Sequence, residues 1–214
     1  MTSTQFDIVR QLRPAVATFA ALSLLTGLAY PLIVTGIAQV ALPGQANGSL
    51  LRRDGAVVGS RLVGQARSSP GRFWARPSAT APRPYTAFDA ATGGGSGGSN
   101  LAPTNPALVD AVAARIAALH DADAAAGYAR PADQLVPVDL VTSSASGLDP
   151  HISRAAAEYQ VPRVARALGR GEDEIRRLVE AHTQRRQIGV FGEPTVNVVE
   201  LNLALDADEA HPAR

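Results

Sequence analysis

Serine, aspartate and histidine occur close together in one short segment of the sequence, 144–151. Ser144 or Ser146, together with Asp149 and His151, would supply the residue types of a hydrolase triad, in which the serine attacks and the histidine takes its proton. The members of a triad must meet in space, which neighbours in one loop rarely do, and neither serine stands in a G-x-S-x-G elbow. We therefore expect turn and helix-capping roles for Ser146 and Asp149, and no catalytic residue.

The usage of histidine, cysteine and lysine limits the chemistry further. The 4 histidines show no H-x3-H spacing and the chain has no cysteine, so we expect no metal site, disulfide or thiol chemistry. The chain also has no lysine, and all 20 of its basic residues are arginine. Walker A loops and Schiff bases both need lysine, so neither can occur. The net charge of +1 gives no case for a nucleic-acid partner.

Three arginines share one helical spacing. Arg163, Arg166 and Arg170 follow an i, i+3, i+7 pattern. Such a face could bind phosphate or an acidic partner, because guanidinium groups pair with both. A solvated basic face without a ligand is the ordinary alternative, and the sequence leaves both open.

These residues follow a long uncharged segment near the start of the chain. Pro14 to Leu42 contains no Asp, Glu, Lys, Arg or His. About 20 apolar residues span a bilayer core, so we expect a transmembrane helix at 14–37, a cytoplasmic tail at 1–13 and a connector at 38–47. A signal peptide has a shorter apolar core and a small-x-small cleavage site, which this segment lacks. Pro31 is expected to kink the span.

One face of the expected span carries small residues. Ala20, Ser23, Gly27 and Tyr30 follow a helical spacing, and Ser23 with Gly27 forms a small-xxx-small pair. Small side chains let a second helix approach closely. We therefore expect this face to dock on a partner helix.

The sequence after the connector predicts a single soluble α+β domain at 48–206, followed by a C-terminal tail at 207–214. A hairpin is expected around Asp54-Gly55, which is the preferred pair for a type I′ turn. The glycine- and proline-rich segment 69–99 predicts an irregular, flexible loop. Asn105, Asp149 and Asn197 are expected to cap helices. The other expected elements are a strand at 135–142, short helices at 152–159 and from Val161 to about Leu168, and a helix at 172–184.

The sequence resembles the C subunit of the Kdp-type potassium-transporting ATPase. The segments that carry the resemblance cover nearly the whole chain, in the family's order: LTGLAYPLIVTGIAQ, VVGSRLVGQ, GGSNLAPTNPAL, VPVDLVTSSASGLDPHIS, YQVPRVARALG and FGEPTVNVVELNLALD. Trp74 and the glycine run at 93–98 depart from the family's usual pattern.

The resemblance implies an accessory subunit of a high-affinity, ATP-driven potassium uptake complex in the bacterial plasma membrane. Its partners would be a channel-like subunit, a P-type ATPase subunit and a small single-span subunit, in contact with membrane lipid. It would act as a catalytic chaperone that raises the ATP affinity of the P-type subunit, without turnover of its own. Any nucleotide or partner surface would involve Ser144, Asp149, His151, Gln160 and Arg163.

The resemblance also places the soluble domain outside the cell, whereas ATP is inside. A role in assembly and gating is therefore an alternative to direct contact with ATP, and no bound cofactor is assigned. Two other classes also remain open: an independent membrane-anchored extracytoplasmic hydrolase, and an anchored protein that binds a small ligand.

Overall fold

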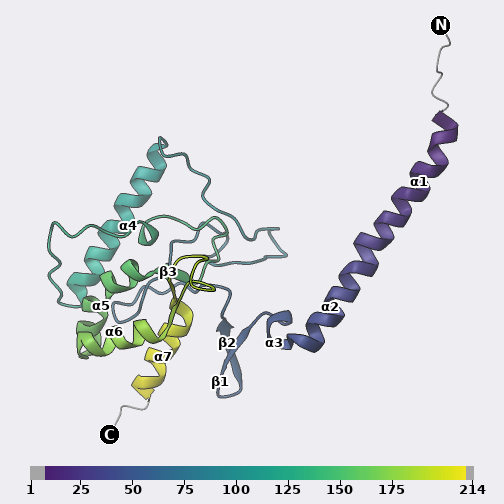
Figure 1. Ribbon diagram of the computed structural model, residues 1–214. Helices are drawn as coiled ribbons and strands as arrows, with labels where there is room; N and C mark the ends of the chain where they lie inside the picture. Colours follow the sequence, from purple (N-terminus) through teal and green to yellow (C-terminus); the bar gives the residue numbers. More distant parts are fainter. Residues whose placement is uncertain (1–7, 211–214) are drawn as a thin grey trace. The chain divides into compact units, whose positions relative to one another are not determined.

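The computed structural model describes residues 8–210, which divide into two compact units on either side of the Ser49–Leu50 bond. The first unit is a helical rod that consists of α1 (Ile8–Leu24), a π-helical turn (Leu25–Ala29) and α2 (Tyr30–Ala41), as Figure 1 shows. A short helix, α3 (Pro43–Ala46), follows it. The rod is long and apolar enough to cross a membrane from Arg10 to Ala41.

The rod extends beyond the span expected at 14–37 at both ends. Helix α1 already includes residues 8–13 of the expected tail, α2 continues to Ala41, and residues 1–7 lie outside the described part. Pro31 is the second residue after the π-helical turn, which ends at Ala29, and the Tyr30 N–H donates to the Leu25 carbonyl five residues back. Such turns occur where a helix must absorb a local irregularity. The wider turn therefore accompanies the proline, which lacks an N–H group and crowds the preceding turn of a regular helix.

The second unit begins with the expected hairpin. Strands β1 (Leu50–Arg53) and β2 (Ala56–Ser60) pair antiparallel, with a bulge between Leu51 and Arg52. Asp54 and Gly55 both have positive φ, 50° and 80°, as a type I′ turn requires. The hairpin prediction is confirmed. After the end of β2 the chain turns back, and Ser60 pairs with Val63 in an isolated bridge.

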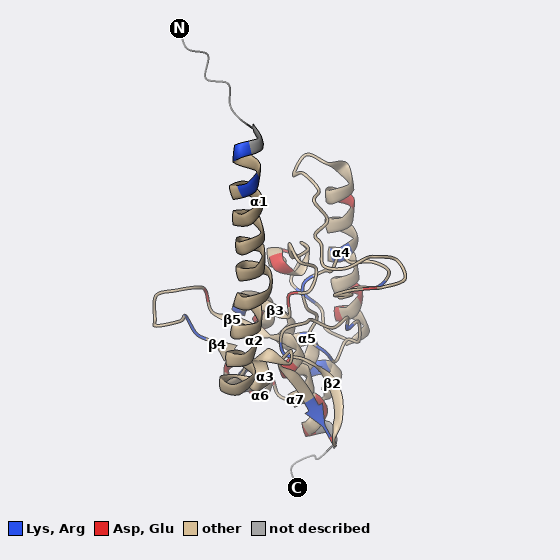
Figure 2. Ribbon diagram, turned by 90° about the vertical axis from the view of Figure 1, so that its right-hand side faces the viewer, with Lys and Arg blue, Asp and Glu red and all other residues tan. Residues whose placement is uncertain are grey.

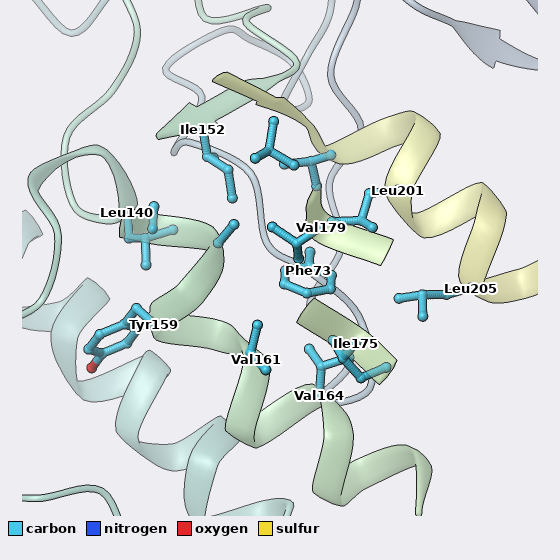
Figure 3. Packing of buried hydrophobic residues seen from close by; sticks show 14 of the residues in the cluster. Phe73, Leu140, Ile152, Tyr159, Val161, Val164, Ile175, Val179, Leu201 and Leu205 are labelled. Atoms are coloured by element: carbon cyan, nitrogen blue, oxygen red, sulfur yellow. The ribbon is translucent and has the colours of Figure 1, made fainter. Parts of the chain in front are cut away.

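The core lies among a small sheet, four helices and one extended segment. Strands β3 (His151–Ser153), β5 (Thr195–Asn197) and β4 (Thr183–Gln184) form an antiparallel sheet in that order. The helices are α4 (Pro106–Ala125), α5 (Arg154–Leu168), α6 (Glu172–Ala181) and α7 (Val198–Ala210). Figure 3 shows the packed apolar side chains, which include Phe73, Ile152, Val164, Ile175, Val179, Leu201 and Leu205. This α+β architecture agrees with the expected fold class.

Two capping predictions are confirmed. The Asn105 side chain accepts a hydrogen bond from Ala107 N at the start of α4. The Asn197 side chain accepts from Val199 N and Glu200 N at the start of α7. Helix α7 continues to Ala210, beyond the start of the tail expected at 207.

Two predictions around residues 135–159 are wrong. The expected strand at 135–142 is a 3-10 turn, η2 (Val138–Leu140), because Pro137 lacks an N–H group and its neighbours Leu135 and Val138 are exposed. The start of the helix expected at 152–159 is also wrong, because Ile152 and Ser153 belong to the strand β3, which pairs with β5 far along the chain.

Helix α5 starts later than expected and is not divided at Pro162. It begins at Arg154, with the Ser153 side chain as its cap, and it continues through Pro162 to Leu168. The two short helices expected in this region are therefore one helix.

The expected irregular segment, residues 69–99, is held by two buried amides. Asn202 on α7 accepts from the Phe73 N–H and donates to the Phe73 carbonyl, both at 2.9 Å. Gln160 on α5 does the same for Trp74, at 2.8 and 3.1 Å. Side-chain amides here replace the neighbouring strand that would normally pair with an extended backbone. Phe73 is thereby fully buried, and Trp74 packs against the core.

The glycine run is also tied to the rest of the unit. The Gly97 N–H donates to the Ser146 carbonyl at 2.8 Å, and the Ser96 hydroxyl donates to the same oxygen at 3.0 Å. A Cβ atom added at Gly98 would lie only 3.0 Å from the Ala145 carbonyl. Glycine therefore suits this position, because a side chain would force the two loops slightly apart.

Candidate functional site

Asp149 lies at the centre of a small charged cluster on the second unit. Its Oδ2 lies 3.4 Å from Arg76 Nη1, and its Oδ1 lies 3.4 Å from His151 Nδ1. The same Oδ1 accepts the His151 backbone N–H at 3.0 Å. Asp149 therefore closes a turn at the start of β3 and does not cap a helix, because the helix begins later, at Arg154.

The ionised form of Asp149 is favoured. Burial by itself would raise the pKa of this carboxyl, but hydrogen bonds from His151 and the positive charge of Arg76 outweigh it and hold the pKa below the ordinary value. The cluster thus keeps a negative charge next to a permanent positive one at neutral pH.

Two grooves meet at this cluster, because both are lined by Arg76, Asp149 and His151. One continues along the loop that contains Ser144 and Ser146. The other continues between η2 and the end of the β4–β5 connection, where its lining is Pro137, Val138, Asp139, Glu193, Pro194 and Thr195. The cluster is therefore accessible from two sides, as a recognition surface would be.

The histidine is engaged away from the serines. His151 Nε2 lies 3.5 Å from the amide nitrogen of Asn197, and Nδ1 faces Asp149. Within residues 8–210, no hydrogen bond joins His151 to Ser144 or Ser146. The arrangement gives neither serine a general base, and within the same residues no group of His, Asp and Glu could hold a metal ion.

Gln160 and Arg163 lie in the interior, apart from the groove that contains Ser144, Asp149 and His151. Both are 0% exposed. The oxygen of Gln160 accepts from Trp74 N and Arg163 Nη2, while its nitrogen donates to the carbonyls of Trp74 and Ala156. The structure thus brings three of the five expected site residues together and uses the other two to hold the extended segment.

Arg163 belongs to a buried ionic cluster on α4 and α5. Asp123 lies 2.5 Å from Arg130 Nε and 3.6 Å from Arg163 Nε. Arg163 also donates to the carbonyls of Pro70 and Arg72. Burial, opposed by the charge of Asp123, lowers the pKa of Arg163 to about 10. The guanidinium of Arg130 lies 3.6 Å above the ring of Tyr159, which adds a cation–π contact.

The basic face expected from Arg163, Arg166 and Arg170 is therefore not a solvated surface. Arg163 is buried, and Arg170 is paired with Glu174 and Asp208. Only Arg166 is exposed, and it donates to the Gly127 carbonyl. The three arginines do share one helical spacing on α5 and its end, but the face that they form points partly into the core.

Arg76 also lines a third space, a cavity of about 360 Å³. Its wall contains Trp74, Tyr85, Arg67, Arg76 and Arg115, and it includes no Asp or Glu. Within the described residues neither Arg67 nor Arg115 forms an ion pair, and Arg76 Nε is buried without a hydrogen-bond partner. We call this space the arginine cavity. Its volume and lining suit a small anion that has a flat or apolar part.

Burial also changes the titration of groups around the arginine cavity. The pKa of Arg115 is lowered because its charge is partly removed from water. Burial raises the pKa of Tyr85 to about 12. The nearby charge of Asp149 also raises this pKa, whereas the charge of Arg76 lowers it. The Tyr85 hydroxyl donates to the Arg76 carbonyl, so this tyrosine links the cavity to the charged cluster.

The sequence contained a signal for one residue of the buried cluster. Asp123 continues the apolar stripe of α4 at the spacing of Ile116 and Leu119, so a buried position could have been inferred for it. Arg67, Arg76 and Arg115 offered no such signal, because they meet only through the fold.

On the first unit, the expected docking residues are exposed. A Cβ atom added at Gly27 would have no neighbour within 4 Å. Ala20 and Ser23 precede the π-helical turn, Gly27 lies inside it, and Tyr30 follows it. Because such a turn adds one residue, it rotates the helix beyond it by about 100°. Tyr30 is therefore turned away from the stripe that a regular helix predicts, while the docking role itself stays a prediction.

Comparison with known proteins gives consistent matches over both units. The family described as "K+-transporting ATPase, c chain" matches residues 12–207. A "Potassium-transporting ATPase KdpC subunit" of Sorangium cellulosum (strain So ce56) is 57% identical over 199 residues, which are 93% of this chain and 98% of that relative. The subunit of the same name from Burkholderia vietnamiensis (strain G4 / LMG 22486) is 56% identical over 196 residues, 92% of this chain and 95% of the relative. The subunit of the same name from Polaromonas naphthalenivorans (strain CJ2) is 57% identical over 196 residues, which are 92% of this chain and 94% of the relative.

Proposed function

The chain belongs to the KdpC family, the c chain of the K+-transporting ATPase, and from this premise we propose that it is an accessory, non-catalytic subunit of an ATP-driven potassium uptake complex. The observation that carries the proposal is the match over residues 12–207, which includes the apolar rod and the second unit together. We further propose that the rod crosses the bacterial plasma membrane once and that the second unit lies on its outer face.

The rod is the part most suited to assembly. Its apolar side chains are exposed along its length, and Figure 2 shows charged residues only near its N-terminal end. The sequence has Arg10 and Arg13 there. Lipid or partner helices can cover such a surface, and the close approach allowed at Gly27 favours a helix. The partners in this proposal are a channel-like subunit, a P-type ATPase subunit and a small single-span subunit.

Docking is tested by filling the open face of the rod. The complex is purified through a tag on another subunit, with Gly27→Leu or the control Gly36→Leu in this chain; neither glycine has a neighbour within 4 Å of an added Cβ. Recovery of this chain should fall several-fold for Gly27→Leu and stay unchanged for the control. Equal recovery of both variants would reject docking through Gly27.

The finer role in this proposal is that of a catalytic chaperone, which raises the affinity of the P-type subunit for ATP. Gln160 and Arg163 are poor candidates for a direct nucleotide contact, because both are buried and fully occupied within the second unit. The proposed effect is therefore carried by assembly, with the charged cluster around Asp149 as part of the surface that meets a partner.

A second candidate function is binding of a small anion in the arginine cavity. The specific observation is that Arg67 and Arg115 line it without an ion pair within the described part. A ligand that binds only the folded state raises the melting temperature of the full chain in detergent. ATP, phosphate and benzoate are suitable probes, with Arg115→Gln expected to abolish the shift and the exposed Arg166→Gln expected to keep it. No shift with any probe would rule this function out for these ligand types.

A further inference from the structure

The loop that joins β4 and β5 has a tight turn at its tip, with three exposed apolar side chains. Gln187 and Phe191 are joined by two backbone hydrogen bonds, of 2.8 and 2.9 Å, across a turn formed by residues 188–190. Ile188, Val190 and Phe191 are 90%, 69% and 66% exposed. We call these three residues the apolar tip. Figure 2 shows this loop reaching out beyond the sheet of its own unit.

The backbone at the tip is unsuited to the residue it contains. Ile188 has φ of 53° and Gly189 has φ of 74°. Glycine adopts this left-handed conformation freely and asparagine tolerates it, whereas for a β-branched residue it is an outlier. Isoleucine at this position contributes no burial within the unit, since its side chain is almost fully exposed. Its presence is therefore better explained by a contact made outside the unit.

Two arginines lie at the base of the loop, and one of them is tied across it. Arg186 Nη2 lies 2.7 Å from both carboxylate oxygens of Glu193, which pins the two sides of the loop together. Arg185 is exposed, and its ion pair with Glu180 is long, at 3.8 Å. Residues 184–192 include no Asp or Glu. The tip thus presents apolar side chains with a cation directly behind them.

A lipid surface is the occupant that this combination fits. Residues 42–49 join the apolar rod to the second unit, and when extended they reach at most about 30 Å. A second unit so tethered stays close to the surface of the membrane in which the rod lies. Exposed Ile, Val and Phe side chains enter the boundary between headgroups and acyl chains, and adjacent arginines attract anionic headgroups.

We propose that the apolar tip inserts into the interface of the membrane that the rod spans, with Arg185 paired to the phosphate of anionic phospholipids. The proposal rests on the membrane anchor of the proposed function and not on potassium transport or ATP. The tip would act as a second attachment that limits the rotation of the second unit about its tether.

The test uses the absence of cysteine from the chain. Ile188→Cys, and separately Leu135→Cys as a control of nearly equal exposure (90% and 88%), are labelled with an environment-sensitive fluorophore. The full chain is reconstituted into vesicles of phosphatidylcholine, alone or mixed with phosphatidylglycerol. Emission wavelength, quenching by iodide in the water and quenching by nitroxide-labelled lipids are measured at both positions.

The label at position 188 should emit at shorter wavelength, resist iodide several-fold more than the control label, and be quenched by the labelled lipids. Its protection should be greater with phosphatidylglycerol, and Arg185→Gln should remove that difference while the exposed Arg177→Gln preserves it. Equal access of iodide to both labels in both vesicles would overturn the proposal. Protection that appears only after the other subunits are added would also overturn it and would assign the tip to a protein pocket.

Discussion

Asp123 Oδ1 lies 3.6 Å from Arg163 Nε, and the side chains of these two residues are only 3% and 1% exposed. Asp123 also pairs with Arg130, so one buried carboxylate faces two arginines. This cluster joins α4 to α5 and, through the carbonyls that Arg163 binds, to the extended segment at 70–72. It explains how a segment with neither helix nor strand is held in place.

Removing the negative charge from this cluster should be strongly destabilising. In Asp123→Asn two arginines would stay buried without a counter-charge, and breaking a buried pair in this way costs about 3 to 5 kcal/mol. Urea unfolding of the full chain in detergent measures the change in free energy. Asp110→Asn, at an exposed position on the same helix, is the control and should change it little. A loss of similar size in both variants would contradict the structural role of Asp123.

The charged cluster at Asp149 should make stability depend on pH in the acid range. Its pKa is lower in the folded chain than in the unfolded chain, so its contribution is present at neutral pH and is lost as the pH falls through the folded-state value. The melting temperature of Asp149→Asn should therefore fall less steeply than that of the unaltered chain below the ordinary carboxyl pKa of about 3.9. Parallel curves for the two proteins would show that Asp149 contributes nothing to acid sensitivity.

Gly64 should not accept a side chain, because it packs against both Tyr85 and the loop before β3. An added Cβ would overlap the Tyr85 ring and lie 3.1 Å from the Asp149 carbonyl oxygen, while the Gly64 N–H donates to Leu148 O at 2.8 Å. Overpacking of this kind costs about 1 to 3 kcal/mol. Gly64→Ala should therefore lower the free energy of unfolding, whereas Gly171→Ala, where the added atom meets nothing within 4 Å, should have a smaller effect. The reverse order of the two losses would contradict the close packing at Gly64.

Replacing the isoleucine at the apolar tip should stabilise the chain. Ile188→Asn places a residue that tolerates positive φ at the turn, and relief of the left-handed conformation is expected to stabilise the chain by about 1 kcal/mol. Thermal unfolding in detergent checks this expectation. A clear loss of stability in Ile188→Asn would mean that the isoleucine side chain supports the fold.

The sequence alone predicted the parts of the fold that depend on local chemistry. The Asp54–Gly55 turn and the caps at Asn105 and Asn197 were recovered, because turn conformation and capping depend on residues close together in the chain. The cap expected at Asp149 was wrong, since pairing of β3 with β5 decides the conformation of residues 151–153 and lies far along the sequence.

The candidate site was predictable only in part, for the same reason. Ser144, Asp149 and His151 are neighbours in sequence and line one groove. Arg76 joins them from the extended segment, which has no periodic pattern to reveal where it lies. Gln160 and Arg163 were expected at a nucleotide or partner surface, but in the fold they provide the hydrogen bonds that the extended segment lacks.

The proposed accessory role in an ATP-driven potassium pump can be measured as the ATP dependence of potassium-stimulated ATP hydrolysis, on the complex with and without this chain and on the chain alone. We expect a several-fold rise in the ATP concentration for half-maximal rate when the chain is omitted, its recovery when the chain is added back, and no hydrolysis by the chain alone. Identical ATP dependence with and without the chain would contradict the accessory role.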